Sequence, residues 1–586
     1  MPQFYEDDIH VIHGPPTTRP LSYESLGVEI LETLQKLSEN AIAMIDIFTE
    51  QKITYSELLQ KSINLAVALE MLNCTGQDTV LSISSENSLH FFVPVLASLF
   101  NLSIMAPINH MYTIYEMEHV LNISRPKVVF CSRELLGKFQ YLKKKLEFIE
   151  YIIVLESSTT ATAVENMDEL INRVLQGRKI TAKQFRAANG MADKLIALIL
   201  CSSGTTGLPK GVAVSHLGIQ VNLNRFNDQQ YEEIQSEQRK ITQQNVLGLI
   251  PFFHAYGCLL TLSNLVKGNV IVCMKKFEED IFLRAIQNYK IEVLFLAPPL
   301  VVFLAKSDKV LQYDLSGVKS ILCGAAPLSK GTEEEAIRRL KNAKFRQGYG
   351  LTEMTLVVTM FKVDEYRPGS CGKMAAACSG KVMDMETGRS LKPNQPGELC
   401  FSGPGVMIGY YKNQKATEES FTPNGWLRTG DIGYYDNDGY FFIVDRLKEL
   451  IKFKGFQIAP AELEALLIKN PKINDVGVVG LPDESVGERP MAFVVKQPNA
   501  NISEQEIQKY VADFGIFEEL EENRENVTPQ PKRKIKKMAK KLKKDVRRIK
   551  KEIKVQLAVV AGKPIKFKWT VSADDMHEVI LTNTTK

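Results

Sequence analysis

The chain has 586 residues, of which 45% are hydrophobic and 24% are charged, and its formal net charge is +4. This length exceeds one compact domain, and the composition is that of an ordinary soluble protein. No segment offers the roughly 20 consecutive apolar residues of a membrane span, so we expect none. The acidic N-terminus at 1–8 does not fit a secretory signal. The nine scattered cysteines fit buried thiols of a reducing compartment better than a metal site.

Short apolar runs alternate with amphipathic stretches from about residue 21 to residue 445. This alternation predicts an α/β fold with layered, mostly parallel sheets in a large N-terminal domain over 1–445. The segment 397–445 is richer in glycine and aromatic residues, which predicts a small β subdomain. The predicted strands are 80–83, 127–130, 195–201, 246–250, 270–273, 293–296 and 321–322, and the predicted helices include 55–72 and 330–341.

A smaller domain is predicted to begin near residue 446. Pro460 suits the first turn of a helix, and it predicts one at 461–469. Two strands, at 476–479 and 492–496, and a helix at 504–514 complete a small, mobile α+β domain over 446–514. Because no further elements of this kind follow, we predict that the domain is truncated.

The remaining segment, 515–586, is an atypical tail with a strongly basic part. Residues 532–554 carry 14 lysines and arginines against two acids, a local charge of +12 that leaves −8 for the rest of the chain. Apolar side chains recur there at helical spacing, so we predict a basic amphipathic helix at about 532–556. This apolar stripe is Ile535, Met538, Leu542, Val546, Ile549 and Ile553. Such a helix suits an anionic lipid surface, nucleic acid or an acidic partner helix; the alternative is an exchanged exon or a misjoined gene model.

A loop rich in glycine and hydroxyl residues follows the strand predicted at 195–201. Its backbone N–H groups, its hydroxyls and a lysine suit a polyanion, whereas an ordinary surface turn does not need this composition. It differs from the Walker type of phosphate loop, because Lys210 stands between Pro209 and Gly211. The residues singled out in this loop are Ser202, Ser203, Gly204, Thr205, Thr206, Gly207 and Lys210.

This loop and five later motifs, in the same order, resemble the acyl-adenylate-forming superfamily. That superfamily includes acyl-CoA synthetases, 4-coumarate–CoA ligases and beetle luciferases. The resemblance covers about residues 30–513, and it implies two steps: a carboxylate attacks the α-phosphate of ATP, and the thiol of coenzyme A then displaces AMP. The motifs are 201–211, 251–257, 324–328, 347–353, 426–431 and 445–452.

The resemblance also implies roles for single residues. The loop would cradle the β- and γ-phosphates, Thr352 would contact the α-phosphate, and Glu353 would hold Mg²⁺, a cation that prefers oxygen ligands. Asp431 would accept the ribose hydroxyls. His254 would line the acyl and nucleotide site, whereas a lone histidine beside aromatic residues more often belongs to a core. The other implied ATP or AMP contacts are Gly324, Ala325, Ala326, Gln347, Gly348, Tyr349, Gly350, Leu351, Arg446 and Gln457, and the implied acyl-pocket residues are Tyr256 and Leu356.

The segment 445–450 would be the hinge at which the C-terminal domain rotates between the two steps. Lys448 stands at the hinge position, and Lys452 belongs to the face that forms the thioester. Lys454 and Gly455 match positions that contact coenzyme A. The alternative interpretation is an exposed basic strand in which lysines alternate.

The chain departs from the superfamily at its C-terminal end. The superfamily ends with Pro-Lys-x-x-x-Gly-Lys, whose last lysine bridges the substrate carboxylate and the α-phosphate, and nothing after Phe514 fits this pattern. Gly562-Lys563 is the only Gly-Lys there, and it lacks the preceding residues. Removing one preorganised charge of this kind costs roughly 10²–10³ in rate, so we predict impaired adenylation.

Two positions bear on the substrate. Leu356 and Asn222 stand where beetle luciferases carry a small polar residue and an arginine, and both changes make the pocket more apolar. We therefore predict an ATP-dependent acid–CoA ligase for a fatty or aryl-aliphatic acid, with ATP, Mg²⁺ and coenzyme A as cofactor and co-substrates. The alternatives are a luciferin 4-monooxygenase-like enzyme and a non-catalytic adenylate-binding protein tethered by its basic tail.

The sequence leaves the oligomeric state open and gives two options for the compartment. The superfamily resemblance favours the peroxisome. The C-terminus at 584–586 is not an address of the Ser-Lys-Leu type, so a cytoplasmic location fits equally.

Overall fold

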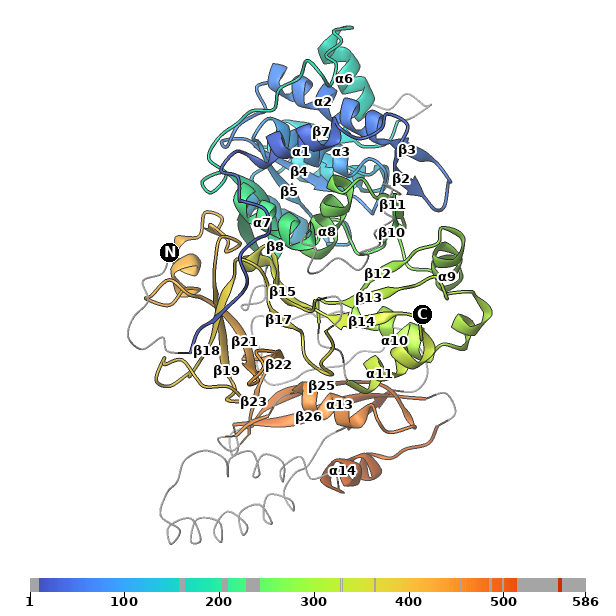
Figure 1. Cartoon of the computed structure of the whole chain (residues 1–586), viewed down its shortest axis with the longest axis vertical. Helices are drawn as coiled ribbons and strands as arrows, with labels where there is room; N and C mark the ends of the chain where they lie inside the picture. Colours follow the sequence, from blue (N-terminus) through green and yellow to red (C-terminus); the bar gives the residue numbers. More distant parts are fainter. Residues whose placement is uncertain are drawn as a thin grey trace. The chain divides into compact units, whose positions relative to one another are not determined.

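The computed structural model describes the residues 10–157, 164–202, 209–227, 243–326, 328, 330–362, 365–447, 449–453, 456–458, 460–483, 487–497, 500–513 and 557–560. The chain divides into two compact units, Met1–Lys448 and Glu449–Lys586, and each unit is described by itself. Figure 1 labels their helices and strands in chain order. Within the described ranges, no helix combines the length and the apolar character that crossing a membrane requires.

Two seven-stranded sheets hold most of the strands of the first unit (Figure 1). One has the order β20-β9-β8-β5-β4-β6-β7, parallel from β8 to β7 and antiparallel where β9 and β20 join. Its parallel strands are almost continuously apolar and buried, as expected for strands covered on both faces. The strands are β4 (Val80–Ser84), β5 (Ile104–Pro107), β6 (Val128–Cys131), β7 (Tyr151–Val154), β8 (Ile196–Ser202), β9 (Lys210–Ser215) and β20 (Gly409–Tyr410).

The other seven-stranded sheet has the order β14-β13-β12-β10-β11-β2-β3. All of its pairs are parallel except β2 with β3. Parallel order brings the carboxyl ends of β12, β13 and β14 to one edge, where ligands bind in open α/β sheets. The strands are β2 (Ile42–Asp46), β3 (Lys52–Thr54), β10 (Asn245–Gly248), β11 (Val270–Cys273), β12 (Val293–Leu296), β13 (Ser320–Cys323) and β14 (Lys344–Gln347).

Three helices of this unit, α2, α4 and α6, begin at a capping box. Thr54, Thr113 and Asn166 each accept a hydrogen bond from the backbone of a glutamate three residues on, whose carboxylate bonds back to the cap. Pro298 occupies the first turn of α10. The helices are α1 (Leu26–Leu34), α2 (Tyr55–Met71), α3 (Phe92–Phe100), α4 (Ile114–Ser124), η1 (Arg133–Leu135), α5 (Leu136–Lys143), α6 (Met167–Leu175), α7 (His216–Asn227), α8 (Ala255–Val266), α9 (Glu279–Asn288), α10 (Pro298–Lys306), η2 (Asp308–Gln312) and α11 (Lys330–Arg339).

Two antiparallel sheets complete the first unit. One is the three-stranded sheet β15-β16-β17, and the other has the order β1-β18-β19-β21-β22. The β subdomain predicted over 397–445 therefore begins earlier, at residue 379, and it also recruits a strand from residues 12–13. The elements are β1 (Ile12–His13), β15 (Tyr349–Leu351), η3 (Thr352–Met354), β16 (Leu356–Met360), β17 (Lys373–Met374), β18 (Ser379–Met383), β19 (Gly397–Ser402), α12 (Gln414–Glu419), β21 (Leu427–Tyr435) and β22 (Phe441–Arg446).

The second unit is a small α+β domain. Its sheet has the order β24-β23-β26-β25, and β27 pairs in parallel with β26. The strand β27 comes from the segment predicted as a tail, whereas the whole of the predicted basic helix at 532–556 lies outside the described residues. The elements are β23 (Ile451–Phe453), β24 (Phe456–Ile458), α13 (Pro460–Leu467), β25 (Ile473–Asp483), β26 (Gly487–Lys496), α14 (Glu504–Asp513) and β27 (Leu557–Val560).

The structure confirms the α/β fold predicted from the sequence. The seven predicted strands of the large domain and the two predicted helices agree with the observed bounds to within two residues. The predicted burial of the thiols is also confirmed, since eight of the nine cysteines are buried and Cys201 is partly buried.

Candidate active site

The predicted phosphate loop joins β8 to β9. Ser202 ends β8 and Lys210 begins β9, and the two residues are cross-strand partners at the mouth of the loop. The hydroxyl oxygen of Ser202 is buried and has no hydrogen-bond partner among the described residues. A buried hydroxyl of this kind is free to bond a ligand oxygen, which agrees with the phosphate-binding role that the sequence suggested.

Thr352 and Glu353 lie beside the same strands. They open η3, which contacts both β8 and β9, and Thr352 is only 9% exposed. The Tyr410 hydroxyl donates a hydrogen bond of 2.9 Å to Oε1 of Glu353. The structure therefore brings a hydroxyl and a carboxylate to the place where the loop meets the sheet.

The carboxylate of Glu353 suits a magnesium ion. In the part of the chain that the structure describes, no three His, Cys, Asp or Glu side chains gather to hold a metal by themselves. Mg²⁺ is usually bound through one or two carboxylates, with water and substrate phosphates as the other ligands. Oε2 of Glu353 accepts no hydrogen bond from any described residue, so this oxygen is available to such an ion.

Asp431 is held by two neighbours. The Tyr349 hydroxyl donates a hydrogen bond of 2.6 Å to Oδ2, and Nε of Arg446 lies 3.4 Å from Oδ1. Asp431 and Arg446 are cross-strand partners on β21 and β22. Burial, and then the Asp431 carboxylate, raise the pKa of Tyr349 well above its usual value, so its hydroxyl stays protonated.

Several of the predicted ATP or AMP contacts lie at the carboxyl ends of β13 and β14. Gly324 follows β13 and Gly348 follows β14, and the backbone N–H of Gly348 donates to the carbonyl of Cys323 at 2.9 Å. Ala325 has a left-handed backbone (φ +76°), and Ala326 follows it. Beside them, the side-chain amide of Gln347 donates to Glu333 at 2.8 Å.

Gly350 and Leu351 belong to β15, next to this edge. A Cβ atom on Gly350 would lie 1.7 Å from the carbonyl oxygen of Leu356, so no other residue fits there without moving the strand. Leu356 is buried and has φ +93°, which is rare for a branched, bulky side chain. Backbone strain of this kind concentrates at functional sites, and here it directly follows Thr352 and Glu353.

His254 and Tyr256 stand at the start of α8. Nδ1 of His254 accepts the backbone N–H of Tyr256 at 3.2 Å, so in the neutral ring the proton lies on Nε2. His254 is exposed to solvent, while the protein that crowds its other sides disfavours a positive charge and lowers the pKa of the imidazole. Tyr256 is buried, and its hydroxyl donates to the carbonyl of Leu322 at 3.2 Å.

Several predicted site residues cannot be placed. The side chains of Lys452 and Gln457 lie outside the described residues, although their backbones belong to β23 and β24. The residues wholly outside are Ser203, Gly204, Thr205, Thr206, Gly207, Lys448, Lys454 and Gly455. Their roles stay predictions.

Tyr410 belongs to the site but was not among the residues predicted from the sequence. Its only local signal is the Gly-Tyr-Tyr triplet at 409–411, because a two-residue strand has no periodicity to read. The structure places Tyr410 between Lys210 and Glu353: its hydroxyl bonds Glu353, and Nζ of Lys210 lies 4.7 Å from its ring centroid.

Comparisons with known proteins agree with this geometry. The sequence model described as AMP-binding enzyme matches residues 31–411, and the model described as AMP-binding enzyme C-terminal domain matches residues 462–563. The second match extends past residue 513, where the resemblance predicted from the motifs ends. Luciferin 4-monooxygenase of Photinus pyralis is 40% identical over 509 residues, covering 86% of this chain and 91% of that protein.

Two further relatives represent a ligase and a solved structure. Peroxisomal OPC-8:0-CoA ligase 1 of Arabidopsis thaliana is 36% identical over 480 residues, covering 80% of this chain and 84% of that protein. The structure of a red-emitting luciferase from Phrixothrix hirtus has a TM-score of 0.68 and 38% identity, covering 86% of this chain and 92% of that one. With the motifs, the fold and these matches in agreement, the chain belongs to the AMP-binding enzyme family, which is the acyl-adenylate-forming superfamily.

Proposed function

We propose that the protein is an ATP-dependent acid–CoA ligase that activates a hydrophobic carboxylic acid, fatty or aryl-aliphatic, through an acyl-AMP intermediate. The observation that carries this proposal is the meeting of η3 with β8 and β9. It brings Glu353, a carboxylate suited to a metal ion, to the strands that hold Ser202 and Lys210, two groups suited to phosphate. Asp431, on β21 of another sheet in the same unit, supplies a carboxylate suited to ribose hydroxyls.

In the first half-reaction, a carboxylate oxygen of the acid forms a bond to the α-phosphorus of ATP. The bond from that phosphorus to the bridging oxygen breaks, and pyrophosphate leaves with the electron pair. Lys210 would offset the charge of the leaving phosphates, and Thr352 would donate a hydrogen bond to the α-phosphate. Glu353 would hold Mg²⁺, which supplies neutralisation of the phosphate oxygens.

In the second half-reaction, the thiolate sulfur of coenzyme A forms a bond to the acyl carbon. The bond from that carbon to the AMP oxygen breaks, AMP leaves, and the thiol proton passes to solvent. We assign Lys452 to this step. We expect Lys452→Ala to block thioester formation from preformed acyl-AMP while ATP binding, followed by calorimetry, stays intact; an unchanged thioester yield would remove Lys452 from the step.

The proposed class of acid follows from the surroundings of Leu356. Asn222, which stands where beetle luciferases carry an arginine, accepts the backbone N–H of Val357 at 3.2 Å and donates to the carbonyl of Gly218 at 3.2 Å. Its side chain is 1% exposed, and both of its polar ends are used by the backbone. It therefore offers nothing to a polar ring, which favours an apolar acid.

A luciferin 4-monooxygenase-like activity is the second candidate. It is favoured by identities of 37–40% to several proteins named luciferin 4-monooxygenase. Purified protein given luciferin and ATP with magnesium would emit light if this candidate were correct, whereas we expect none. The peroxisome and the cytoplasm both stay proposals for the compartment; one relative carries the word peroxisomal in its name.

The decisive experiment is pyrophosphate release with a panel of fatty and cinnamic acids of graded length. The same panel is run on this chain and on a variant given a C-terminus of the superfamily type. We expect slow release from the first and faster release from the second, with the same order of preference among the acids. Silence from both chains would favour a non-catalytic adenylate-binding protein and overturn the ligase proposal.

A further inference from the structure

One side chain, Tyr410, contacts two groups of opposite charge in the candidate active site. Its ring lies beside Lys210, with Nζ 4.7 Å from the ring centroid, and its hydroxyl donates to Oε1 of Glu353 at 2.9 Å. The face of an aromatic ring attracts a cation, and the phenol hydroxyl is a donor suited to a carboxylate. Tyr410 can therefore hold a cation and an anion at the same time.

The backbone around Tyr410 is fixed on the side of the phosphate loop. The strand β20 pairs with β9, so that Tyr410 lies opposite Val212, two residues after Lys210. The next residue, Tyr411, donates its backbone N–H to the carbonyl of Gly211 at 2.7 Å. Lys210 and Tyr410 thus stand on paired strands, so the sheet fixes the distance between their backbones.

The same segment is also fixed on the side of Glu353. The backbone N–H of Met407 donates to the carbonyl of Glu353 at 2.8 Å, and the Thr355 hydroxyl donates to the carbonyl of Gly405 at 2.7 Å. Gly409 has φ +157°, and a Cβ atom there would lie 2.8 Å from Thr417, so only glycine allows the chain to turn into Tyr410. The segment 405–411 is therefore a bridge between the phosphate loop and the metal-binding carboxylate.

The opposite charges on either side of Tyr410 do not meet. Among the described ion pairs, none joins Lys210 to Glu353 within 4.0 Å, although both contact the same tyrosine. A direct ion pair between them would use the two charges that the phosphates and the metal need. Tyr410 therefore keeps the two charged groups on separate sides of one side chain.

We propose that Tyr410 is a positioning residue for adenylation, which keeps Lys210 and Glu353 apart and aimed at the phosphates and the metal before either ligand binds. This inference rests on the proposed function, because it assumes that Glu353 meets a magnesium–nucleotide complex. The hydroxyl positions Glu353 for the metal ion, and the ring positions Lys210 for the phosphates. Two substitutions of Tyr410 separate these tasks.

The first variant, Tyr410→Phe, keeps the ring and removes the hydroxyl. We expect the Mg²⁺ concentration that half-saturates ATP binding to rise about tenfold, since a hydrogen bond to a charged group is lost. ATP binding without metal should stay unchanged, because the ring still faces Lys210. Both quantities are measured by calorimetry on the full chain, so the result does not depend on turnover.

The second variant, Tyr410→Leu, removes the ring as well. We expect ATP binding to weaken about threefold even without metal, because the cation loses the ring and becomes free to pair with Glu353. Tyr411→Phe is the matched control, since Tyr411 follows in sequence and its ring faces Lys412 instead. Thermal unfolding of each variant identifies any variant that fails to fold. If Tyr410→Leu fails to fold, Tyr410→Phe, which keeps the shape of the side chain, still tests the positioning role.

The outcomes separate the two proposals. Wild-type protein that binds magnesium–ATP supports the proposed function, and identical Mg²⁺ titrations for wild type and Tyr410→Phe would overturn the positioning role alone. An equal loss with and without metal in Tyr410→Phe would also overturn it, because that is the result of general damage. If the wild-type protein bound no nucleotide, that result would overturn the proposed function and, with it, the positioning role of Tyr410.

Discussion

Asp431 is oriented by a neighbour's hydroxyl before any ligand arrives. The Tyr349 hydroxyl, 2.6 Å from Oδ2, is buried and stays protonated, so one carboxylate oxygen is fixed in direction. Asp431 itself is only 8% exposed. If Asp431 accepts ribose hydroxyls as we propose, a carboxylate fixed in this way would lose little freedom on binding, which is how preorganised polar groups contribute to affinity.

We predict that Asp431→Asn raises the KM for ATP by at least about tenfold and changes kcat less, because hydrogen bonds to a charged acceptor are lost. Steady-state pyrophosphate release measures both constants. The matched control is Asp438→Asn, a carboxylate in the turn between β21 and β22 that is 64% exposed. An equal rise of KM in both variants would show that the loss of one negative charge raises KM wherever it occurs. The contact between Asp431 and ATP would then not be the cause.

His216 is a buried, neutral histidine at the start of α7. It is fully buried, and its Nδ1 accepts the backbone N–H of Leu26 at 3.2 Å. Burial lowers its pKa from 6.5 to about 4. Between these values the unfolded chain takes up a proton that the folded chain refuses, so the free energy of unfolding falls as the pH drops from 6.5 towards 4.

We predict that His216 alone makes the protein less stable at pH 4 than at pH 6.5 by up to about 3 kcal/mol. In His216→Gln the denaturant midpoint should fall less steeply between pH 6.5 and pH 4 than it does in the wild type. This holds whether the substitution raises or lowers the stability at neutral pH. His90, whose pKa is also lowered to about 4, keeps part of the slope. His13→Gln, at an exposed position, is the control, and a slope unchanged in His216→Gln would contradict the prediction.

At the scale of elements, α7 determines the course of β16. Asn222 accepts the backbone N–H of Val357, and Arg225 donates to its carbonyl at 2.5 Å, so both polar groups of one strand residue are held by one helix. Arg225 is fully buried and also donates to the carbonyl of Ala376 at 2.7 Å. These hydrogen bonds from α7 explain how the strained backbone of Leu356, a proposed acyl-pocket residue, persists.

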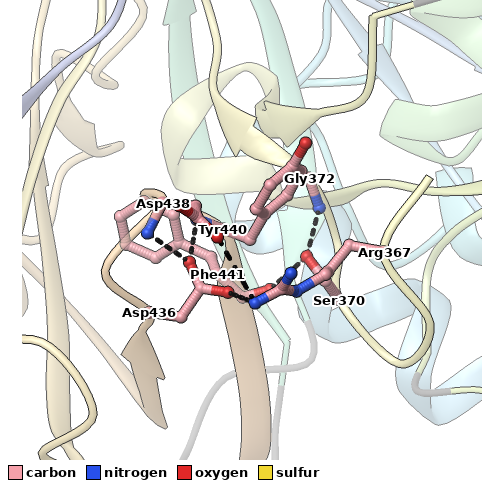
Figure 2. A network of polar contacts seen from close by, with 7 residues as sticks. All are labelled: Arg367, Ser370, Gly372, Asp436, Asp438, Tyr440 and Phe441. Atoms are coloured by element: carbon pink, nitrogen blue, oxygen red, sulfur yellow. Dashed lines mark hydrogen bonds and ion pairs between the residues drawn. The ribbon is translucent and has the colours of Figure 1, made fainter. Parts of the chain in front are cut away.

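The first unit also contains an arginine contact network in which the arginine itself is partly exposed (Figure 2). Arg367 donates to Oδ2 of Asp436 at 2.7 Å, and Oδ1 of Asp436 accepts the backbone N–H groups of Asp438 and Tyr440. The guanidinium carbon also lies 5.6 Å from the centroid of the Tyr440 ring. Because the Arg367 side chain is 44% exposed, solvent screens this ion pair.

These two arginines give a matched pair of predictions. Arg225→Lys should lower the free energy of unfolding by about 2–4 kcal/mol, because an ammonium group cannot reproduce the planar donors that reach separate carbonyls. Arg367→Lys should cost less than about 1 kcal/mol, as is usual for exposed pairs. Urea denaturation measures both, and similar losses in the two variants would show that burial does not decide the cost.

The elements also show what the sequence could reveal. Buried parallel strands such as 270–273 and 293–296 are uninterrupted apolar runs, so their positions were predictable. The pairing of β20 with β9 was not predictable, because it joins segments about 200 residues apart. The strand β20 has only two residues, so it shows no hydrophobic periodicity. The motifs located Glu353 and Asp431, but their partners Tyr410 and Tyr349 emerge only when distant strands meet.

At the scale of the whole chain, the two family models match separate stretches, one in each unit. The match of the large domain ends at residue 411, within the first unit, and that of the C-terminal domain runs from 462 to 563. The latter ends on Gly562-Lys563, the only Gly-Lys of the tail. Shortly before it, β27 pairs with β26 in the second unit. Lys563 is therefore the residue at which the predicted loss of the catalytic lysine can be tested.

We predict that Lys563→Ala does not slow adenylation further, because the residues before it lack the pattern that carries the superfamily's lysine. ATP–pyrophosphate exchange measures the first half-reaction, and thioester formation from preformed acyl-AMP measures the second. Lys566→Ala is the control for charge in this segment. If Lys563→Ala instead lowered exchange by about 10²-fold and left thioester formation intact, Lys563 would supply the preorganised charge, and the C-terminal domain would be extended by an insertion rather than truncated.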